Sequence, residues 1–380
     1  MIQTISLDNE FPLDDRLIYL NHAAVSPWPQ RSCEAVKAFA DENSRTGAYH
    51  YPEWMAKETQ LREQLAQLIH APATDDIALL KNTSEALSVV AHGLSWQQGD
   101  NIIISDEEFP SNRIVWESLQ QQGVSVRPIN LANAASAEQA LIEAMDAHTR
   151  LLAISSVQYA SGLRVNLPLL GEACSQRGIL FCVDAIQSVG ALQTNVEDMQ
   201  ADFVMADGHK WMLGPEGLAF FYSRPTARAQ LTLHQFGWHM VEDYLDFNNK
   251  NWQLAQNARR FECGSPNMLG IHALSASLSL LLEVGMETVE QQLLDNSRHL
   301  FAEIRASDNL QVLSNTTEGR FAGIALFRHR HIPAADLYAQ LMKKGIVCAA
   351  RGQGVRFSPH FYTDKDKISE AIRIADRMVA

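Results

Sequence analysis

The sequence predicts an α/β protein: a large domain with a mostly parallel seven-stranded sheet, and a smaller C-terminal α/β domain. Three observations support this prediction. Between residues 76 and 223, seven short apolar runs are separated mostly by segments of helical periodicity. Beyond residue 261, strand-like runs again alternate with helical segments. The chain has 380 residues, of which 46% are hydrophobic, and this is enough for a sizeable core in each domain.

The expected elements follow from the spacing of apolar residues. Two helices come first, over 31–43 and 51–70, where apolar residues recur at helical spacing with charged residues between them. The expected strands of the sheet are 76–81, 101–105, 124–130, 151–157, 179–185, 202–207 and 217–223. The helical patterns between them cover 83–94, 111–123 and 167–178. Strands that alternate with helices are typical of a parallel sheet covered on both faces, and ligands bind at the carboxyl ends of such strands.

Residues 234–380 show a different pattern of apolar residues. Residues 234–260 show little periodicity, and we expect an irregular connection there. A long apolar helix is predicted over 272–294, with strands over 321–327 and 345–350. The expected division is an N-terminal arm, a large domain and a small C-terminal domain, which cover residues 1–20, 21–255 and 256–380.

Composition and charge exclude several classes of partner. The formal net charge of −13 opposes binding to the phosphate backbone of nucleic acid, and no basic cluster offers a local exception. The start of the chain does not resemble a secretory signal, and the longest apolar stretch, 274–285, is interrupted by serines. We therefore expect a cytoplasmic protein with no nucleic-acid or membrane partner. Five widely separated cysteines without a CxxC pair predict neither a disulfide framework nor a zinc site.

The motif ADGHKWMLGPEG, residues 206–217, places Lys210 between His209 and Trp211 directly after an expected buried strand. A lysine forms a Schiff base with a carbonyl only through its neutral amine, so proteins that use this chemistry bury the lysine or lower its pKa. Lys210 is therefore a candidate nucleophile. A lysine that caps a strand end is the structural alternative for this tripeptide alone.

The motif VDAIQS places Asp184 at the end of another apolar strand and Gln187 three residues later, which directs both side chains to one side. An ionised carboxylate can keep a ring nitrogen protonated, and an amide can bond to a phenolic oxygen. These are the two polar handles of pyridoxal phosphate. A helix cap at Asp184 with a solvated glutamine is the alternative.

Two further strand ends carry candidate binding residues. Thr83 and Ser84 begin a predicted helix, where free backbone amides and the two hydroxyl groups can bind a phosphate. A capping box formed by Asn82 and Glu85 explains the same residues without a ligand. Phe109 follows the strand over 101–105, and its ring could stack on a planar cofactor or belong to the core.

Four more motifs join these in chain order. The full series is YLNHAAVSP at 19, NTSEA at 82, EEFPSN at 107, SSVQYASG at 155, VDAIQS at 183, ADGHKWMLGPEG at 206, RRFECGSPN at 259 and GVRFSPHFY at 354. It resembles the class V aminotransferase family of pyridoxal-phosphate enzymes, which includes cysteine desulfurases, selenocysteine lyases, kynureninases and isopenicillin N epimerase-like proteins. The resemblance covers most of the chain and implies the fold type I architecture of PLP-dependent transferases.

The resemblance implies how the cofactor pyridoxal 5'-phosphate would be held. Lys210 would be the Schiff-base lysine, Asp184 would pair with the pyridine nitrogen, and Gln187 would meet the phenolic oxygen. Phe109 would stack on the ring. The residues that would hold or lie close to the phosphate are Thr83, Ser84 and His209.

The resemblance also implies a partner and a substrate. Ser265, in RRFECGSPN, would reach the cofactor of a neighbouring subunit, which predicts a homodimer with a shared active site. Arg356, in GVRFSPHFY, would clamp the α-carboxylate of a small amino-acid substrate through two parallel hydrogen bonds. A surface arginine beside a strand is the alternative.

The sequence departs from the family at several positions. Many relatives have serine at the position of Asp207, and no phosphate role is carried over to a carboxylate. Desulfurases have histidine where this chain has Phe109, and they often keep asparagine where it has Gln158 or Tyr159. Desulfurases also carry a nucleophilic cysteine on a loop before the carboxylate-binding arginine. Here Cys348 lies inside an apolar strand pattern instead, which favours a structural role.

The expected function is therefore that of a pyridoxal-phosphate-dependent enzyme acting on a small amino acid. With Lys210 as Schiff-base lysine and general base, the reaction would be transamination or β-elimination. A cysteine desulfurase or selenocysteine lyase is the enzymatic alternative. A non-catalytic binding protein that keeps the fold is the alternative from another class.

Overall fold

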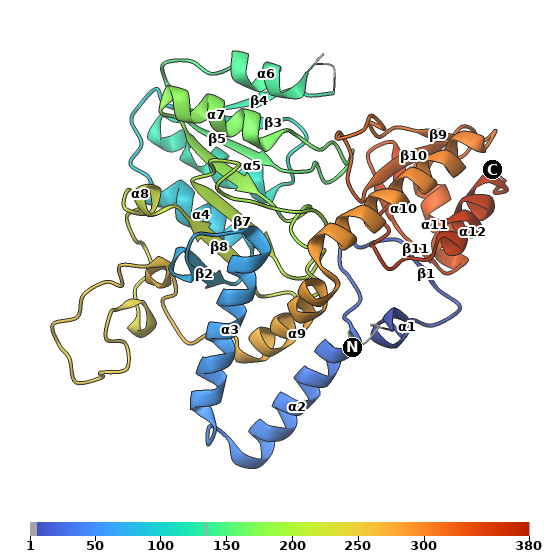
Figure 1. The fold of residues 1–380 in the computed structure, drawn as a ribbon. Coiled ribbons are helices and arrows are strands. Elements are labelled where there is room, and N and C mark those ends of the chain that lie inside the picture. The colour runs from blue at the N-terminus through green and yellow to red at the C-terminus, as the bar shows by residue number, and fades with distance from the viewer. Residues whose placement is uncertain (1–5, 133, 135, 380) are drawn as a thin grey trace.

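A central sheet of seven strands organises the computed structural model, which describes residues 6–132, 134 and 136–379 (Figure 1). The strands are β2 (Ile77–Leu80), β3 (Asn101–Ser105), β4 (Ser125–Ile129), β5 (Thr149–Ser155), β6 (Leu180–Asp184), β7 (Phe203–Asp207) and β8 (Ala219–Ser223). Their spatial order is β2-β8-β7-β6-β5-β3-β4, and β8 alone runs antiparallel to its neighbours. The predicted mostly parallel seven-stranded sheet is confirmed.

Helices cover both faces of this sheet (Figure 1). One face carries α4 (Thr83–Gly93), α5 (Ser111–Glu117) and the 3-10 turn η2 (Ser118–Gln122). The other face carries α3 (Tyr51–Ile69), α7 (Leu167–Arg177) and α9 (Met268–Val284), with α2 (Gln30–Thr46) packed outside against α9. The large domain is completed by α6 (Ala137–Glu143), α8 (Pro225–Arg228) and η1 (Thr74–Asp76).

Burial on both faces explains the unbroken apolar runs of the strands. On β6, Phe181 and Val183 pack into the core shared with α3, α7 and α9, whereas Leu180 and Cys182 pack into the core shared with α4 and α5. Successive side chains of a strand point to opposite faces, so a strand covered on both sides must be apolar at nearly every position. On β6 the polar residue is Asp184, at the carboxyl end of the strand.

A second, smaller sheet lies to one side of the first (Figure 1). It is antiparallel, with the order β12-β13-β10-β9. Its strands are β9 (Leu310–Val312), β10 (Ala325–His329), β12 (Ala349–Arg351) and β13 (Gly354–Phe357), and the helices α10 (Met286–Ala306), α11 (Ala334–Lys343) and α12 (Lys365–Asp376) surround it. After the short helix α1 (Leu7–Glu10), the N-terminal arm joins this part of the molecule, because β1 (Ile18–Tyr19) pairs in parallel with β11 (Ile346–Val347).

The prediction of one long helix over 272–294 is wrong in one respect, because two helices, α9 and α10, cover this segment. They meet at Gly285, whose φ of 85° lies in the left-handed region that ends a helix. Among the described residues no single helix has the length and apolar composition to cross a membrane, and α9 and α10 meet both criteria only as a pair bent by 85°. The predicted domain boundary at 255/256 stays a prediction. Since α9 packs along α2 and α3, we propose a boundary near Gly285 instead.

The segment between α8 and α9 projects from the body of the molecule (Figure 1). Its described residues form two 3-10 turns, η3 (Trp238–Met240) and η4 (Ala258–Phe261), and an isolated β-bridge between Val241 and Leu254, in line with the lack of periodicity. Large apolar side chains are exposed along it, namely Phe236, Leu245, Phe247 and Trp252.

Candidate active site

The candidate residues gather at the carboxyl edge of the large sheet. Asp184 ends β6, and Lys210 lies on the turn that follows the neighbouring strand β7. Phe109 follows β3, and Thr83 begins the helix after β2. Parallel strands end at the same edge of a sheet, so residues separated by more than 100 positions along the chain come together.

Lys210 is a buried amine. The residue is 8% exposed, and its Nζ lies 5.6 Å from the centre of the Phe109 ring. Within the described part of the chain, Nζ makes no hydrogen bond or salt bridge. Burial lowers the pKa of Lys210 to about 8, although the nearby Asp184 carboxylate opposes this shift. A neutral, nucleophilic amine is therefore accessible close to neutral pH.

The turn around Lys210 is fixed by backbone hydrogen bonds and by close packing. Leu213 N donates to Lys210 O at 3.0 Å, and Gly214 N donates to Gly208 O at 2.8 Å. A Cβ atom at Gly214 would lie 2.5 Å from Leu274 Cδ1 on α9, so a larger residue there would force the buried Leu274 side chain to shift. The Gly-rich motif thus lets the turn pack on α9 and holds the lysine at the sheet edge.

Asp184 is a buried carboxylate whose charge is stabilised by few hydrogen bonds. The residue is 2% exposed, and its Oδ1 accepts a hydrogen bond from Ile186 N at 3.1 Å. Burial raises the pKa of Asp184 to about 7, and the Ile186 amide only partly opposes this shift. No arginine, lysine or histidine of the described chain forms a salt bridge with Asp184. A cationic ring nitrogen placed beside it would restore the ionised form.

Gln187 is buried, and its amide already has partners. Its Nε2 donates to Ala23 O at 3.1 Å, and its Oε1 accepts from Trp211 Nε1 at 2.8 Å. These bonds link Ala23, in the segment after β1, to the residue that follows Lys210. The role predicted for Gln187 at a phenolic oxygen stays a prediction.

The start of α4 has the features of an anion site. The capping predicted as an alternative is present, because Asn82 Oδ1 accepts from Glu85 N at 2.9 Å. It leaves the hydroxyl of Thr83 buried and without a partner among the described residues. Ser84 Oγ donates to Ser111 Oγ at 2.8 Å. The first amides of a helix have no partner within the helix, so the cap and a bound phosphate can coexist.

His209 and Asp207 lie beside each other. His209 Nδ1 is 3.1 Å from Asp207 Oδ1, an ion-pair distance, and Asp207 is buried. The Asp207 carboxylate, to which the sequence analysis assigned no role, therefore faces the imidazole of His209, the residue before Lys210. The phosphate role predicted for His209 stays a prediction.

Phe109 and its neighbour Glu108 play different structural roles. Phe109 is 41% exposed as a residue, and its ring meets Tyr159 edge to face, with 5.2 Å between ring centres. Glu108 is buried and accepts from Ser155 N at 2.8 Å and Gln158 Nε2 at 3.0 Å. Burial raises the pKa of Glu108. Sequence reasoning missed Glu108, although the motif EEFPSN contains it.

Arg356 is almost completely enclosed, at 1% exposure. Its Nη1 donates to Tyr159 O at 2.6 Å, its Nη2 to Asn21 Oδ1 at 3.5 Å, and its Nε has no partner among the described residues. Burial, followed by the charge of Arg351, lowers the pKa of Arg356 to about 9. A buried guanidinium without a carboxylate partner favours an anionic ligand. Asn21, in the motif YLNHAAVSP, was not predicted as a contact.

Ser265 lies on the exposed loop after η4 and lines a cavity of about 250 Å³ together with Lys81 and Glu85. Its role in a partner subunit stays a prediction. The loop is anchored by Glu262, which accepts from Arg62 Nη1 and Nη2, each at 2.7 Å, and from Leu79 N at 2.7 Å.

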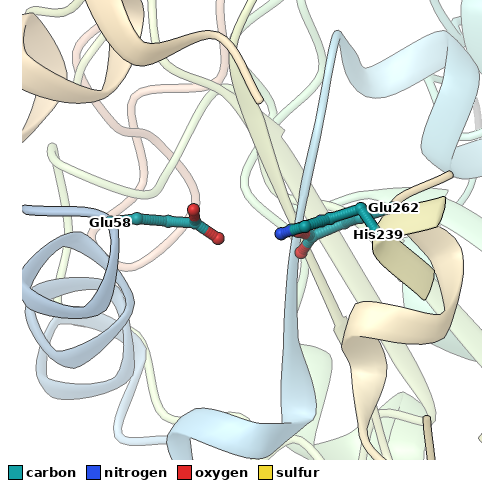
Figure 2. A group of neighbouring side chains, drawn as sticks. All are labelled: Glu58, His239 and Glu262. Carbon is teal, nitrogen blue, oxygen red and sulfur yellow. The ribbon is translucent and has the colours of Figure 1, made fainter. Parts of the chain in front are cut away.

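Two more side chains complete this anchor. Figure 2 shows Glu58, on α3, facing Glu262 and His239. Their nearest oxygen and nitrogen atoms all lie within 4.8 Å of one another. Arg62 donates to both carboxylates and supplies the positive charge between them. We interpret the cluster as an ion-pair network that holds the 257–267 segment against α3.

Comparison with known proteins identifies the family. The family model for class V aminotransferases matches residues 18–375, nearly the whole chain. The chain belongs to the class V aminotransferase family. Class V aminotransferases are pyridoxal-phosphate-dependent enzymes, so membership confirms the predicted family, the enzyme class and the cofactor.

Relatives of this class V aminotransferase carry different names. A probable cysteine desulfurase of Methanothermobacter thermautotrophicus is 27% identical, covering 97% of this chain and 96% of the relative. An uncharacterized aminotransferase of Bacillus subtilis is 29% identical, covering 85% of this chain and 84% of the relative.

Solved structures share the fold. A lysine-to-alanine mutant of C-DES, with glycine covalently linked to the PLP cofactor, superposes with a TM-score of 0.92 at 21% identity. It covers 99% of this chain and 100% of its own. The cystine C–S lyase C-DES in complex with its product cysteine persulfide has a TM-score of 0.90, also at 21% identity, over 96% and 99% of the two chains. The predicted fold class is thus confirmed.

Proposed function

We propose that this class V aminotransferase uses pyridoxal phosphate at Lys210 to transform a small amino acid, by transamination or β-elimination. The observation that carries the proposal is the buried Lys210 amine, which has no bonding partner among the described residues and faces both Phe109 and the Asp184 charge. A lysine in this state serves no structural ion pair, and its lowered pKa suits covalent chemistry with an aldehyde.

The residues present fit the cofactor. Lys210 offers the amine, Asp184 offers a buried carboxylate without a cationic partner, and Thr83 offers an unpaired hydroxyl at a helix start. When bound, pyridoxal phosphate supplies an aldehyde that links to amines and a protonated ring that accepts the electron pair released at Cα. Asp184 would hold the ring nitrogen protonated. The residues assigned to the ring's other contacts are Phe109 and Gln187, and those assigned to the phosphate are Thr83, Ser84 and His209.

Substrate binding is assigned to Arg356 and its neighbours. Arg356 would bind the α-carboxylate, with Asn21 and the Tyr159 carbonyl holding the guanidinium in place. A carboxylate fixed in this way orients Cα toward Lys210. Once the substrate amine has replaced it, Lys210 would accept the Cα proton at Nζ.

Cysteine desulfuration is the second candidate, because relatives of this chain carry that name. The mechanism of such enzymes requires a reactive thiolate near the substrate. Cys348 is 3% exposed, and burial raises its pKa to about 12. Only Gly352 and Gln353 separate β12 from β13, which leaves no cysteine loop before Arg356. These observations favour a reaction without a cysteine nucleophile.

We further propose a cytoplasmic homodimer in which Ser265 of each subunit completes the cofactor site of its partner. The free state of all five cysteines supports a reducing compartment. The exposed position of Ser265 and the exposed apolar side chains between α8 and α9 support a contact with a second copy.

The central test is a spectral screen of the cofactor-loaded protein against common amino acids, with identification of the keto acid, alanine or sulfide produced. Lys210→Ala should lose the cofactor that borohydride traps on the protein, and turnover should fall by roughly 10²–10⁴-fold because the general base is gone. Lys343→Ala, an exposed lysine on α11, serves as the control. Trapped cofactor on the Lys210→Ala protein would refute the lysine assignment.

A further inference from the structure

A second arginine, Arg351, lies beside Arg356 on the same face of the small sheet. β12 and β13 form an antiparallel hairpin in which Ala349 pairs with Arg356 and Arg351 pairs with Gly354. Paired residues of antiparallel strands share a face, and so do residues two positions apart on one strand. Arg351 and Arg356 are therefore diagonal neighbours, with a backbone separation of roughly 7–8 Å.

The hairpin holds Arg351 in place. Its turn consists of Gly352 and Gln353, and Gly352 has a φ of 51°, a conformation that glycine adopts without strain. Arg351 Nη1 donates to Ala350 O at 2.8 Å. The arginine thus sits at the end of a short, hydrogen-bonded ribbon, whereas a long loop at this point would leave it mobile.

Neither arginine has an acidic partner within the described chain. No carboxylate lies within salt-bridge distance of Arg351 or Arg356, and the Nε atom of each is buried without a hydrogen-bond partner. Two adjacent guanidinium groups repel each other, and burial adds a desolvation cost. An arrangement of this kind is stabilised when anions bind between the two groups.

The Arg351 charge also acts on the proposed catalytic centre. It lowers the pKa of Arg356 and, as a smaller contribution, that of Lys210. Both effects agree with the strand register, which places Arg351 on the same face of the small sheet as Arg356. The α-carboxylate of the substrate is assigned to Arg356. The guanidinium of Arg351 therefore has no assigned anionic ligand.

We propose that Arg351 binds a second anionic group at the end of the substrate side chain, so that short dicarboxylic amino acids of the aspartate type are the preferred substrates. This inference rests on the proposed function, because it takes Arg356 as the α-carboxylate site. Planar, bidentate recognition of carboxylates is the chemistry for which arginine is best suited.

The test compares two ligands that differ only in the second charge. Binding of succinate and butyrate to the cofactor-loaded protein is measured by calorimetry, with aspartate and alanine compared in the spectral assay. Succinate should bind at least about tenfold more tightly than butyrate, as expected for one charge-assisted pair. Arg351→Gln should abolish this preference and leave butyrate binding unchanged. Arg351→Lys should restore part of it.

Arg373→Gln, which removes an exposed arginine from α12, is the matched control and should keep the preference. Equal binding of succinate and butyrate by the wild-type protein would overturn the inference. An equal loss of affinity for succinate and butyrate in Arg351→Gln would also overturn it, since Arg351 would then have only a structural role. If the wild-type protein shows no cofactor absorbance, the proposed function fails. If it responds to amino acids without preferring aspartate, only the role of Arg351 fails.

Discussion

At the scale of single residues, the environment of each candidate group decides its chemistry. Lys210 and Cys348 are both buried, and burial disfavours the charged form of each. For the lysine this favours the neutral amine, which is the reactive form. For the cysteine it disfavours the thiolate, which is the reactive form. The same physical effect thus activates one residue and silences the other.

Cys348→Ser should therefore leave turnover within about twofold of the wild-type value, because the thiol is not a nucleophile. The measurement is the rate of product formation with the best amino acid of the screen and, separately, the release of sulfide from cysteine. Circular dichroism should show an unchanged fold. If sulfide release disappears from a folded Cys348→Ser protein, desulfuration becomes the better assignment.

At the scale of elements, the site depends on segments that are held from outside it. The 257–267 segment carries Ser265 and has little regular structure, so its position depends on the contact of Glu262 with Arg62 on α3. Both side chains are largely buried, and the paired carboxylates raise the pKa of Arg62 further above its ordinary value. Removing one partner leaves an uncompensated buried charge.

Arg62→Met should lower the free energy of unfolding by about 3 kcal/mol or more, since Glu262 and Glu58 would lose their shared cation. Urea denaturation followed by tryptophan fluorescence measures the change. Arg298→Met is the matched control, because Arg298 donates to Glu318 at 2.9 Å through two nitrogens but lies on the surface. It should leave the unfolding midpoint nearly unchanged. Equal effects of the two substitutions would contradict the structural role of the buried pair.

At the scale of the whole molecule, the proposed homodimer would make the active site a property of two chains. In a two-fold symmetric dimer the same surface patch of each subunit is buried, so every contact between residue i of one subunit and residue j of the other occurs twice. If Ser265 serves the partner's cofactor, a Lys210 defect on one subunit and a Ser265 defect on the other damage the same site of a hybrid dimer and leave the other site intact.

Mixing experiments test this arrangement. Lys210→Ala and Ser265→Arg should each be inactive alone, and co-refolded mixtures should regain about a quarter of wild-type activity, because half of the dimers are hybrids with one intact site. Light scattering after gel filtration checks that each variant has twice the mass of one chain. Hybrid dimers that form without regaining activity would show that Ser265 does not act across the interface.

Local patterns in the sequence were enough to predict much of this protein. Alternating strands and helices predicted the sheet, since burial on both faces imposes apolar residues along each strand. The placement of Asp184 and Lys210 at strand ends predicted that they would share one edge. The junction of α9 and α10 was missed, because Gly285 interrupts an apolar pattern that otherwise continues through it.

The sequence by itself determined the order of the helices and strands and the types of residue at their ends. The reason is that helical and strand periodicities can be recognised within a few consecutive residues. Only the tertiary structure decided which groups meet: Asn21 with Arg356, Glu262 with Arg62, and the buried Glu108 with Gln158. The physical reason is that such contacts, and the burial that shifts the pKa of Lys210 and Asp184, arise from packing between segments far apart in the chain.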